Sequence, residues 1–211
     1  MSKMLFTPYR MRGLELPNRL VVSPMCQYSA ENGSMTDWHV MHLGTLAQSG
    51  AGLLIVEATA VEPEGRITHG CTGLYSDDNE RAMKRVIDAV RRYGQAKIGI
   101  QIGHAGRKAS SKRPWDAREM NEPVEGGWTT RGPSAVPFKA GWNMPHEMTL
   151  AEIAELKQKF VASTVRANRI GYDMIELHAA HGYLLHQFMS PLSNKRTDKL
   201  IVRSRHLKKK R

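Results

Sequence analysis

The sequence of 211 residues has little of what several common classes of protein require. It contains only two cysteines, Cys26 and Cys71, which lie far apart and in no CxxC pair. This scarcity argues against a disulfide scaffold or a cysteine-based zinc site and suits a reducing cytoplasm. No apolar run reaches the roughly 18–20 residues that a membrane span needs, and the N-terminus lacks the apolar stretch of a secretory signal. We therefore expect a cytoplasmic protein without a membrane partner.

Negative charge is also scarce, since 31 Lys and Arg stand against 20 Asp and Glu, for a net charge of +11. More than half of that excess comes from six basic residues near the C-terminus: Arg203, Arg205, Lys208, Lys209, Lys210 and Arg211. A terminal basic cluster can bind nucleic acid or anionic lipid weakly, but a solvated tail is the simpler interpretation. We do not expect a nucleic-acid partner, and we separate residues 200–211 from the fold as a basic tail.

Short apolar runs alternate with segments of helical periodicity along the chain. The apolar runs predict strands at about residues 19–23, 53–57, 97–102 and 173–178. Helical periodicity predicts helices over 36–48 and 78–93, and a capping box at 149–152 opens a long third helix that ends at Gly171. Four strands separated by helix-sized segments predict parallel βαβ units.

Two architectures contain such units, a doubly wound open sheet and a (β/α)₈ barrel. No GxGxxG follows the first strand, which weakens the dinucleotide-binding open-sheet interpretation. Polar residues gather just past the predicted strand ends, which form the catalytic face of a barrel: Cys26, Tyr28, Glu57, Gln101, His104, His178 and His181. The long segment 104–148 is predicted to be an insertion that covers this face as a loop or hairpin.

The most informative segment is 178–183, which reads His-Ala-Ala-His-Gly-Tyr and directly follows a predicted strand. Two histidines three residues apart can point two imidazole N–H donors at one acceptor, such as a carbonyl or nitro oxygen. Tyr183 adds a weak acid with an ordinary pKa of about 10. Metal binding by His178 and His181 is an alternative, although a zinc site needs a third ligand and HExxH is absent. A purely structural role for the two histidines is a further alternative.

Two further strand ends carry candidate groups. The Cys26 thiol could tune a cofactor, act as a nucleophile or fill space. Gln101 ends the third strand, where a side-chain amide can pair with the amide-like edge of a heterocycle. His104, Arg107 and Lys108 follow Gln101, and their positive charge suits a reduced flavin or a phosphate. Each of these residues could also be a polar group at a strand end without function.

Together these segments resemble the old yellow enzyme family, in order and in spacing, from about residue 5 to residue 199. The matching segments are 24–28, 56–58, 101–107, 178–183 and 190–198. Cys26 with Tyr28 points to the bacterial thermophilic-like branch, which includes NADPH dehydrogenases and xenobiotic reductases. The resemblance implies a (β/α)₈ TIM barrel, of which this chain holds about the first four βα units.

The resemblance also implies an FMN-dependent oxidoreductase that uses NADPH or NADH to reduce activated C=C bonds of α,β-unsaturated carbonyl or nitro compounds. It implies the following ring contacts: Ser23, Pro24, Met25, Cys26, Ala58 and Gln101. His178 and His181 would bind the substrate oxygen, Tyr183 would donate the α-proton, and Tyr28 would help to hold the substrate. Cys26 would tune the redox potential of the flavin. No metal is implied, and members of the family are often homo-oligomers.

After Lys199 the sequence departs from the family pattern. Relatives continue with a Tyr-Gly-Gly-Ser-type segment and four more βα units. We therefore expect residues 1–199 to be the N-terminal half of an FMN-binding barrel, truncated or frameshifted, without the phosphate-binding loops after strands 7 and 8. Such a chain would turn over NADPH slowly. The alternatives to an ene-reductase by descent are an inactive remnant of that enzyme and a binding module that uses the basic tail.

Overall fold

A four-stranded parallel sheet forms the centre of the computed structural model, which describes residues 4–201. The strands, in their order across the sheet, are β3 (Val21–Val22), β4 (Leu53–Ala60), β5 (Lys97–Gly103) and β8 (Met174–Leu177). The order of the strands across the sheet is thus the same as their order along the chain. This order confirms the predicted parallel units and differs from the reversal of strand order in a doubly wound sheet.

The strands differ from the prediction mainly in length. Within the first predicted strand, 19–23, only Val21 and Val22 pair with β4. β4 runs beyond the predicted 53–57, because its ladder with β5 resumes after a register shift between Val56 and Thr59. An irregularity of this kind re-aims the side chains that it carries.

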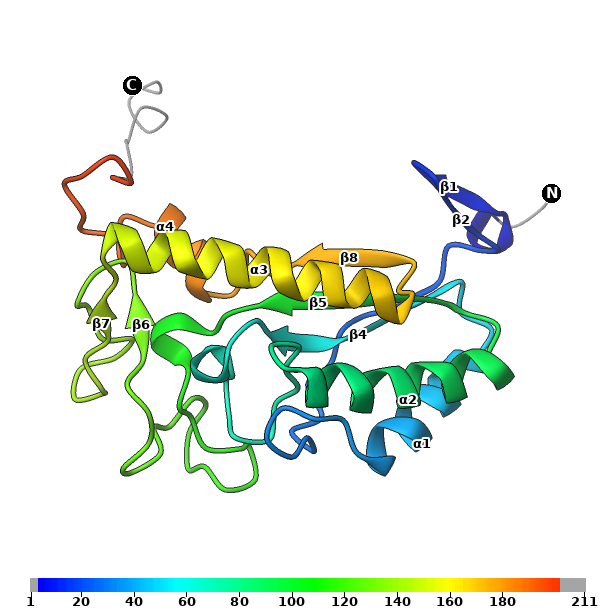
Figure 1. Ribbon diagram of the computed structural model, residues 1–211, viewed down its shortest axis with the longest axis horizontal. Helices are drawn as coiled ribbons and strands as arrows, with labels where there is room; N and C mark the ends of the chain where they lie inside the picture. Colours follow the sequence, from blue (N-terminus) through cyan, green and yellow to red (C-terminus); the bar gives the residue numbers. More distant parts are fainter. Residues whose placement is uncertain (1–3, 202–211) are drawn as a thin grey trace.

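Three helices follow the strands, in the positions that the sequence predicts (Figure 1): α1 (Asp37–Ala47), α2 (Asp77–Tyr93) and α3 (Leu150–Ile170). The predicted capping box opens α3, since Thr149 Oγ1 accepts from the Glu152 backbone N–H at 3.2 Å and the Thr149 N–H donates to Glu152 Oε2 at 2.7 Å. Gly171, with a φ of 96°, ends the helix in a left-handed conformation.

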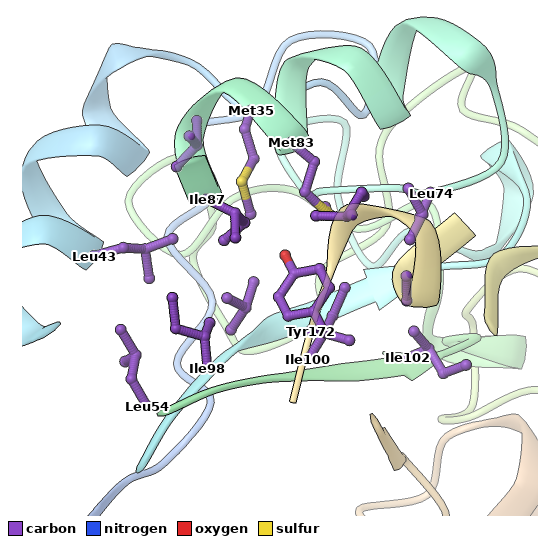
Figure 2. Packing of buried hydrophobic residues seen from close by; sticks show 14 of the residues in the cluster. Met35, Leu43, Leu54, Leu74, Met83, Ile87, Ile98, Ile100, Ile102 and Tyr172 are labelled. Carbon is purple, nitrogen blue, oxygen red and sulfur yellow. The ribbon is translucent and has the colours of Figure 1, made fainter. Parts of the chain in front are cut away.

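The main core lies between these helices and one face of the sheet. Leu54 of β4 and Ile98 and Ile100 of β5 are fully buried there and share a face because strand residues alternate between faces. They pack in one cluster with Met83 and Ile87 of α2 (Figure 2). Because a buried Leu or Ile side chain contributes about 1.5–3 kcal/mol, this layer holds the helices on that face.

The opposite face of the sheet carries a smaller apolar cluster with Leu16, Leu53 and Ile55. Leu16 comes from β2 (Leu14–Leu16), which pairs antiparallel with β1 (Tyr9–Met11). A cavity of ≈ 480 Å³ opens beside this cluster. Helices packed on one face, with strands in sequential order, form the wall of a barrel rather than a sheet wound on both sides.

The segment 104–148 and the short helix α4 (Leu184–Met189) lie at the end of the sheet to which the strands point (Figure 1). The segment is mostly irregular, with η3 (Gly106–Lys108), β6 (Arg131–Gly132) and β7 (His146–Glu147). β6 and β7 pair in parallel, and Ser111 forms an antiparallel bridge with Pro123, so the segment combines loop with one short hairpin-like contact. Neither α4 nor the β1–β2 pair was expected from the sequence.

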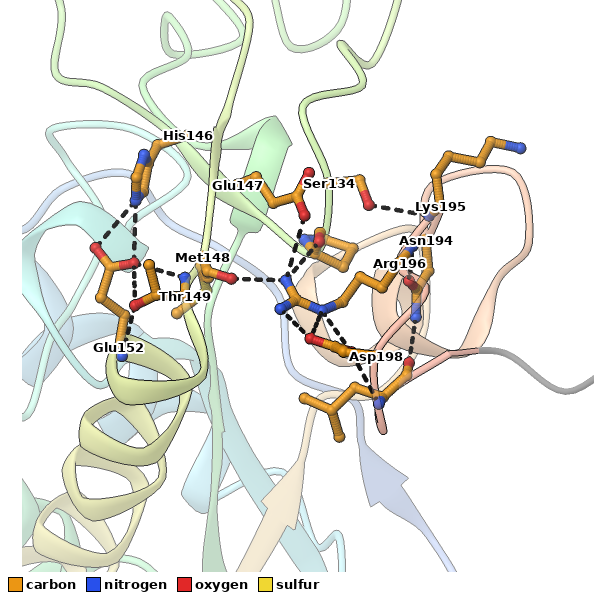
Figure 3. A network of polar contacts seen from close by, with 12 residues as sticks. Ser134, His146, Glu147, Met148, Thr149, Glu152, Asn194, Lys195, Arg196 and Asp198 are labelled. Carbon is orange, nitrogen blue, oxygen red and sulfur yellow. Dashed lines mark hydrogen bonds and ion pairs between the residues drawn. The ribbon is translucent and has the colours of Figure 1, made fainter.

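Arg196 ties this covering segment to the end of the described chain (Figure 3). Its guanidinium donates to the carbonyl oxygens of Pro133 at 2.9 Å and Met148 at 2.6 Å, and it pairs with Asp198 at 2.5 Å. Because guanidinium donors are matched here to carbonyl and carboxylate acceptors, a buried charge is tolerated. Arg196, in the 190–198 motif, is therefore a structural residue.

None of the helices within residues 4–201 is both long and apolar enough to cross a membrane. Most of the predicted basic tail, residues 202–211, lies outside the described residues.

Candidate active site

The rings of His181 and Tyr183 both pack against the ring of His178 in the turn after β8. The ring of His178 lies 5.1 Å from that of His181 and 4.7 Å from that of Tyr183, both edge to face. The Ala180 backbone N–H donates to His178 Nδ1 at 3.3 Å, so the ring proton of neutral His178 sits on Nε2. Burial, followed by the charge of His181, lowers the pKa of His178. At neutral pH this imidazole is therefore a single N–H donor.

The backbone of this turn is held in an uncommon conformation. His181 has a φ of 56°, in the left-handed region that few residues other than glycine occupy. Lys108 Nζ donates to the His181 carbonyl oxygen at 3.0 Å and lies 5.0 Å from the centre of the Tyr183 ring. Tyr28 has the same feature, with a φ of 53°. Backbone strain of this kind clusters at functional sites.

β5 approaches His178 closely at Gly103. A Cβ atom added to Gly103 would lie 3.0 Å from His178 Cβ, tighter than ordinary van der Waals contact. Gln101 is two residues earlier in the same strand and therefore faces the same side of the sheet. The sheet thus brings Gln101 and His178 to one face, as predicted.

Cys26, Tyr28 and Tyr183 pack in one apolar cluster around the buried Cys71 and Ile67. Burial, with further contributions from Cys71 and Glu57, raises the pKa of Cys26 far above its usual range. Burial is also the largest cause that raises the pKa of Tyr28 and of Tyr183. Cys26 therefore remains a thiol at neutral pH, which argues against the nucleophile considered from the sequence.

Ala58 and Gln101 occupy the strand ends differently from one another. Ala58 lies in the irregular step of β4 and is the one position of that strand that is not fully buried. Gln101 is buried, and its Nε2 donates to Glu176 Oε1 at 2.5 Å across the β5–β8 ladder. One N–H of the amide is thus engaged within the protein, which leaves its second N–H and the amide oxygen for another partner.

Ser23, Pro24 and Met25 form the loop between β3 and Cys26. Ser23 and Met25 are exposed, and they border a small cavity that also touches Glu57. They do not line the cavity beside His181 and Tyr183, so they flank the site rather than belong to the His-Tyr cluster.

Two buried charge clusters support the site and were not expected from the sequence. In the first, Glu57 Oε2 accepts from the Gln27 backbone N–H at 3.0 Å, and Glu57 Oε1 lies 3.2 Å from His39 Nε2 of α1. The His39 nitrogen is close to the carboxylate but is not aligned for a hydrogen bond. This contact to Gln27 fixes the loop that carries Cys26 and Tyr28.

The second cluster surrounds Glu62, which follows β4. His104 Nε2 lies 2.8 Å from Glu62 Oε1, and Lys159 Nζ of α3 lies 2.5 Å from Oε2. Because His104 Nδ1 accepts from Gly106, its Nε2–H donates to Glu62. His104 therefore serves this internal cluster and does not offer positive charge to a ligand. Arg107 is likewise occupied, with the carbonyls of Val136 and Pro137.

A cavity of ≈ 460 Å³ lies beside Tyr28, His181 and Tyr183, and its volume is within the usual size range of small-molecule sites. These three residues line it together with residues of the covering segment, whereas His178 lines a smaller neighbouring cavity of ≈ 20 Å³ with Ala58 and Tyr183. Within residues 4–201, no three His, Cys, Asp or Glu side chains are arranged to hold a metal ion.

Comparison with curated proteins places this geometry in context. The chain is 50% identical over 201 residues to an NADH:flavin oxidoreductase of Gibberella zeae. This alignment covers 93% of this chain and 48% of that protein. It is 44% identical over 200 residues to an NADPH dehydrogenase of Geobacillus sp. (strain WCH70), with 94% and 54% covered. The chain thus spans about half the length of the curated relatives it matches.

Solved structures agree. Morphinone reductase in complex with tetrahydroNAD superposes with a TM-score of 0.79 at 28% identity, over 93% of this chain and 55% of that one. Old Yellow Enzyme from Pichia sp. AKU4542 superposes with a TM-score of 0.79 at 31% identity, over 94% of this chain and 52% of that one. The sequence model of the NADH:flavin oxidoreductase / NADH oxidase family matches residues 4–201. The chain therefore belongs to that family, and its four-stranded sheet corresponds to part of the family's (β/α)₈ barrel.

Proposed function

We propose that this chain carries the flavin-binding and substrate-binding face of an FMN-dependent NAD(P)H oxidoreductase that reduces activated C=C bonds. The observation that carries the proposal is the 178–183 turn, where two imidazoles and a phenol pack edge to face at the end of β8. Two N–H donors suit the oxygen of an α,β-unsaturated carbonyl or nitro compound, where charge develops during conjugate reduction. The names of the relatives support NADPH or NADH as the reductant.

The residues at the strand ends fit a flat, uncharged ring. Ala58 places only a methyl group at the one incompletely buried position of β4, and the Cys26 thiol beside the cluster stays neutral. Gln101 keeps an amide oxygen for a ring N–H. The proposed ring contacts are Ser23, Pro24, Met25, Cys26, Ala58 and Gln101. When bound, FMN supplies the hydride chemistry between the nicotinamide and the substrate.

Each side chain of the turn then has a defined role. His178 Nε2–H and an N–H of His181 donate to the substrate oxygen and orient the substrate. Tyr183, whose raised pKa keeps the phenol protonated, holds the proton that the α-carbon receives. Tyr28 borders the same cavity and holds the substrate against the turn.

The proposal predicts that His178→Ala and His181→Ala weaken ligand binding more than flavin binding. Charge-assisted hydrogen bonds contribute roughly 1.5–3 kcal/mol each, so the dissociation constant of 4-chlorophenol should rise by about tenfold or more in each variant. Calorimetry on the FMN-loaded chain measures this constant, and flavin fluorescence measures FMN affinity. His146→Ala, in the distant contact with Glu152, is the matched control. Unchanged phenol affinity in both variants would remove the proposed role.

Steady-state reduction of cyclohex-2-enone with NADPH and excess FMN tests the alternative of an inactive remnant. Binding of FMN and of the phenol without turnover would favour that alternative. We also propose that the protein is cytoplasmic and that it forms a homo-oligomer. Cys26 and Cys71 are both free thiols, which supports a reducing compartment.

A further inference from the structure

The cavity beside Tyr28, His181 and Tyr183 is lined by four charged side chains that differ in whether an opposite charge lies nearby. Three of them have an opposite charge close by. Lys112 lies 2.8 Å and Arg118 2.9 Å from Glu122, and Glu119 lies 2.6 Å from Lys139. Lys108 is different, because no carboxylate lies within 4 Å of its ammonium among residues 4–201.

The Lys108 ammonium is nevertheless held in one place. It lies 4.8 Å from the centre of the Phe138 ring and 5.0 Å from that of Tyr183. One of its three N–H groups reaches the His181 carbonyl oxygen at 3.0 Å. Aromatic faces and one carbonyl orient a cation but do not neutralise it. Two N–H donors and a full charge therefore remain.

We propose that Lys108 recognises a carboxylate on the substrate, so that the natural substrate class is an α,β-unsaturated carbonyl or nitro compound with a carboxylate at its far end. The inference rests on the proposed function, because it places the reacting end of the compound at His178 and His181. Leaving a half-buried cation without a partner is unfavourable, and an anionic ligand removes that penalty. The cavity of ≈ 460 Å³ has room for a small cyclic acid.

The proposal separates Lys108 from the oxyanion site. If Lys108 acted on the reacting oxygen, neutral and anionic ligands would depend on it equally. If it binds a distal carboxylate, only the anionic ligand depends on it. A matched pair of ligands therefore distinguishes the two roles.

The test measures dissociation constants of 4-oxocyclohex-2-ene-1-carboxylate and of its carboxamide by calorimetry on the FMN-loaded chain. We expect the wild-type chain to prefer the carboxylate by about tenfold at low ionic strength, as for one charge-assisted contact. Lys108→Met should abolish this preference and leave carboxamide affinity within about twofold. Lys108→Arg should retain most of it. Lys112→Met, which removes a cation already paired with Glu122, should leave it unchanged.

Equal preference in the wild type and Lys108→Met overturns the proposal, as does failure of the wild-type chain to bind the carboxylate. If Lys108→Met does not fold, the wild type alone decides. Raising the salt concentration from about 0.02 M to about 0.5 M should then erode the carboxylate preference without affecting the carboxamide, and a salt-independent ratio overturns the proposal. The proposed function fails separately, when carboxamide binding is unaffected by His178→Ala and His181→Ala.

Discussion

Cys26 lies where a reactive thiol could act, yet its surroundings suppress its ionisation. Burial is the largest cause, and Cys71 and Glu57 add to it, so the pKa of Cys26 is well above its usual range. Cys71 is fully buried and its pKa is raised to about 11. A neutral thiol is compatible with a ring contact, where it would meet the flavin as a soft, polarizable group.

Alkylation should therefore be slow. We expect the rate of Cys26 modification by iodoacetamide in the folded chain to keep rising above pH of about 9, because the reactive thiolate is still scarce there. Peptide mass spectrometry follows Cys26 and Cys71 separately. The chain unfolded in urea is the control, and its thiols should ionise near the ordinary value of about 8.5. A plateau near neutral pH in the folded chain would restore the nucleophile interpretation.

At the scale of single elements, β5 shapes the site because it has a glycine, Gly103, where it passes His178. Gly103 has no side chain, and this absence lets His178 lie against the strand. Gly103→Ala should push His178 away and weaken phenol binding by up to about tenfold, with a loss of stability of about 1–3 kcal/mol from overpacking. The matched control is Gly44→Ala in α1, where an added Cβ meets nothing within 4 Å and should stabilise the helix by up to about 1 kcal/mol. Calorimetry and urea unfolding give the two quantities, and unaltered phenol affinity in Gly103→Ala would contradict the steric argument.

Elements with strong local signals were predictable from the sequence. The capping box at Thr149 and the left-handed Gly171 fixed the ends of α3, and apolar runs located β4 and β5. The 178–183 turn was predictable because its three polar side chains lie within six consecutive residues. The short pair β1–β2 and the six-residue α4 have too little periodicity to be recognised.

Contacts between distant parts of the chain could not be predicted. Lys108 and His181 are 73 residues apart, and Glu62 and Lys159 are 97 apart. Nothing local in the sequence signals such pairs, since they arise only when the sheet brings strand ends together. For this reason the sequence predicts a positive group for a ligand at His104, whereas His104 instead donates to Glu62.

At the scale of the whole molecule, Glu62 joins four regions. It follows β4 and contacts His104 after β5, Lys159 of α3 and, at 3.6 Å, Arg131 of β6. Burial alone would raise the pKa of Glu62, but the hydrogen bonds from His104 and Lys159 and the charge of Arg131 outweigh it. The pKa falls to about 2 from its ordinary 4.5.

This shift predicts how stability depends on acid. Because the pKa of Glu62 is lower in the folded than in the unfolded chain, its contribution is present above pH 4.5 and is lost as the pH falls toward about 2. Glu62→Gln should lower the free energy of unfolding by about 3 kcal/mol at neutral pH. The difference from the wild type should shrink steadily below pH 4.5, because protonation of the wild-type carboxyl abolishes the same interactions.

Urea unfolding of both chains between neutral pH and about pH 3 measures this difference. Glu119→Gln removes an exposed partner of Lys139 and should change stability by less than about 1 kcal/mol at every pH. Parallel stability curves for the wild type and Glu62→Gln would show that Glu62 does not titrate with folding. A gap that closes only for Glu62→Gln would instead show that one buried carboxylate, contacted from the segment after β5, from β6 and from α3, links the covering segment to the sheet that carries the site.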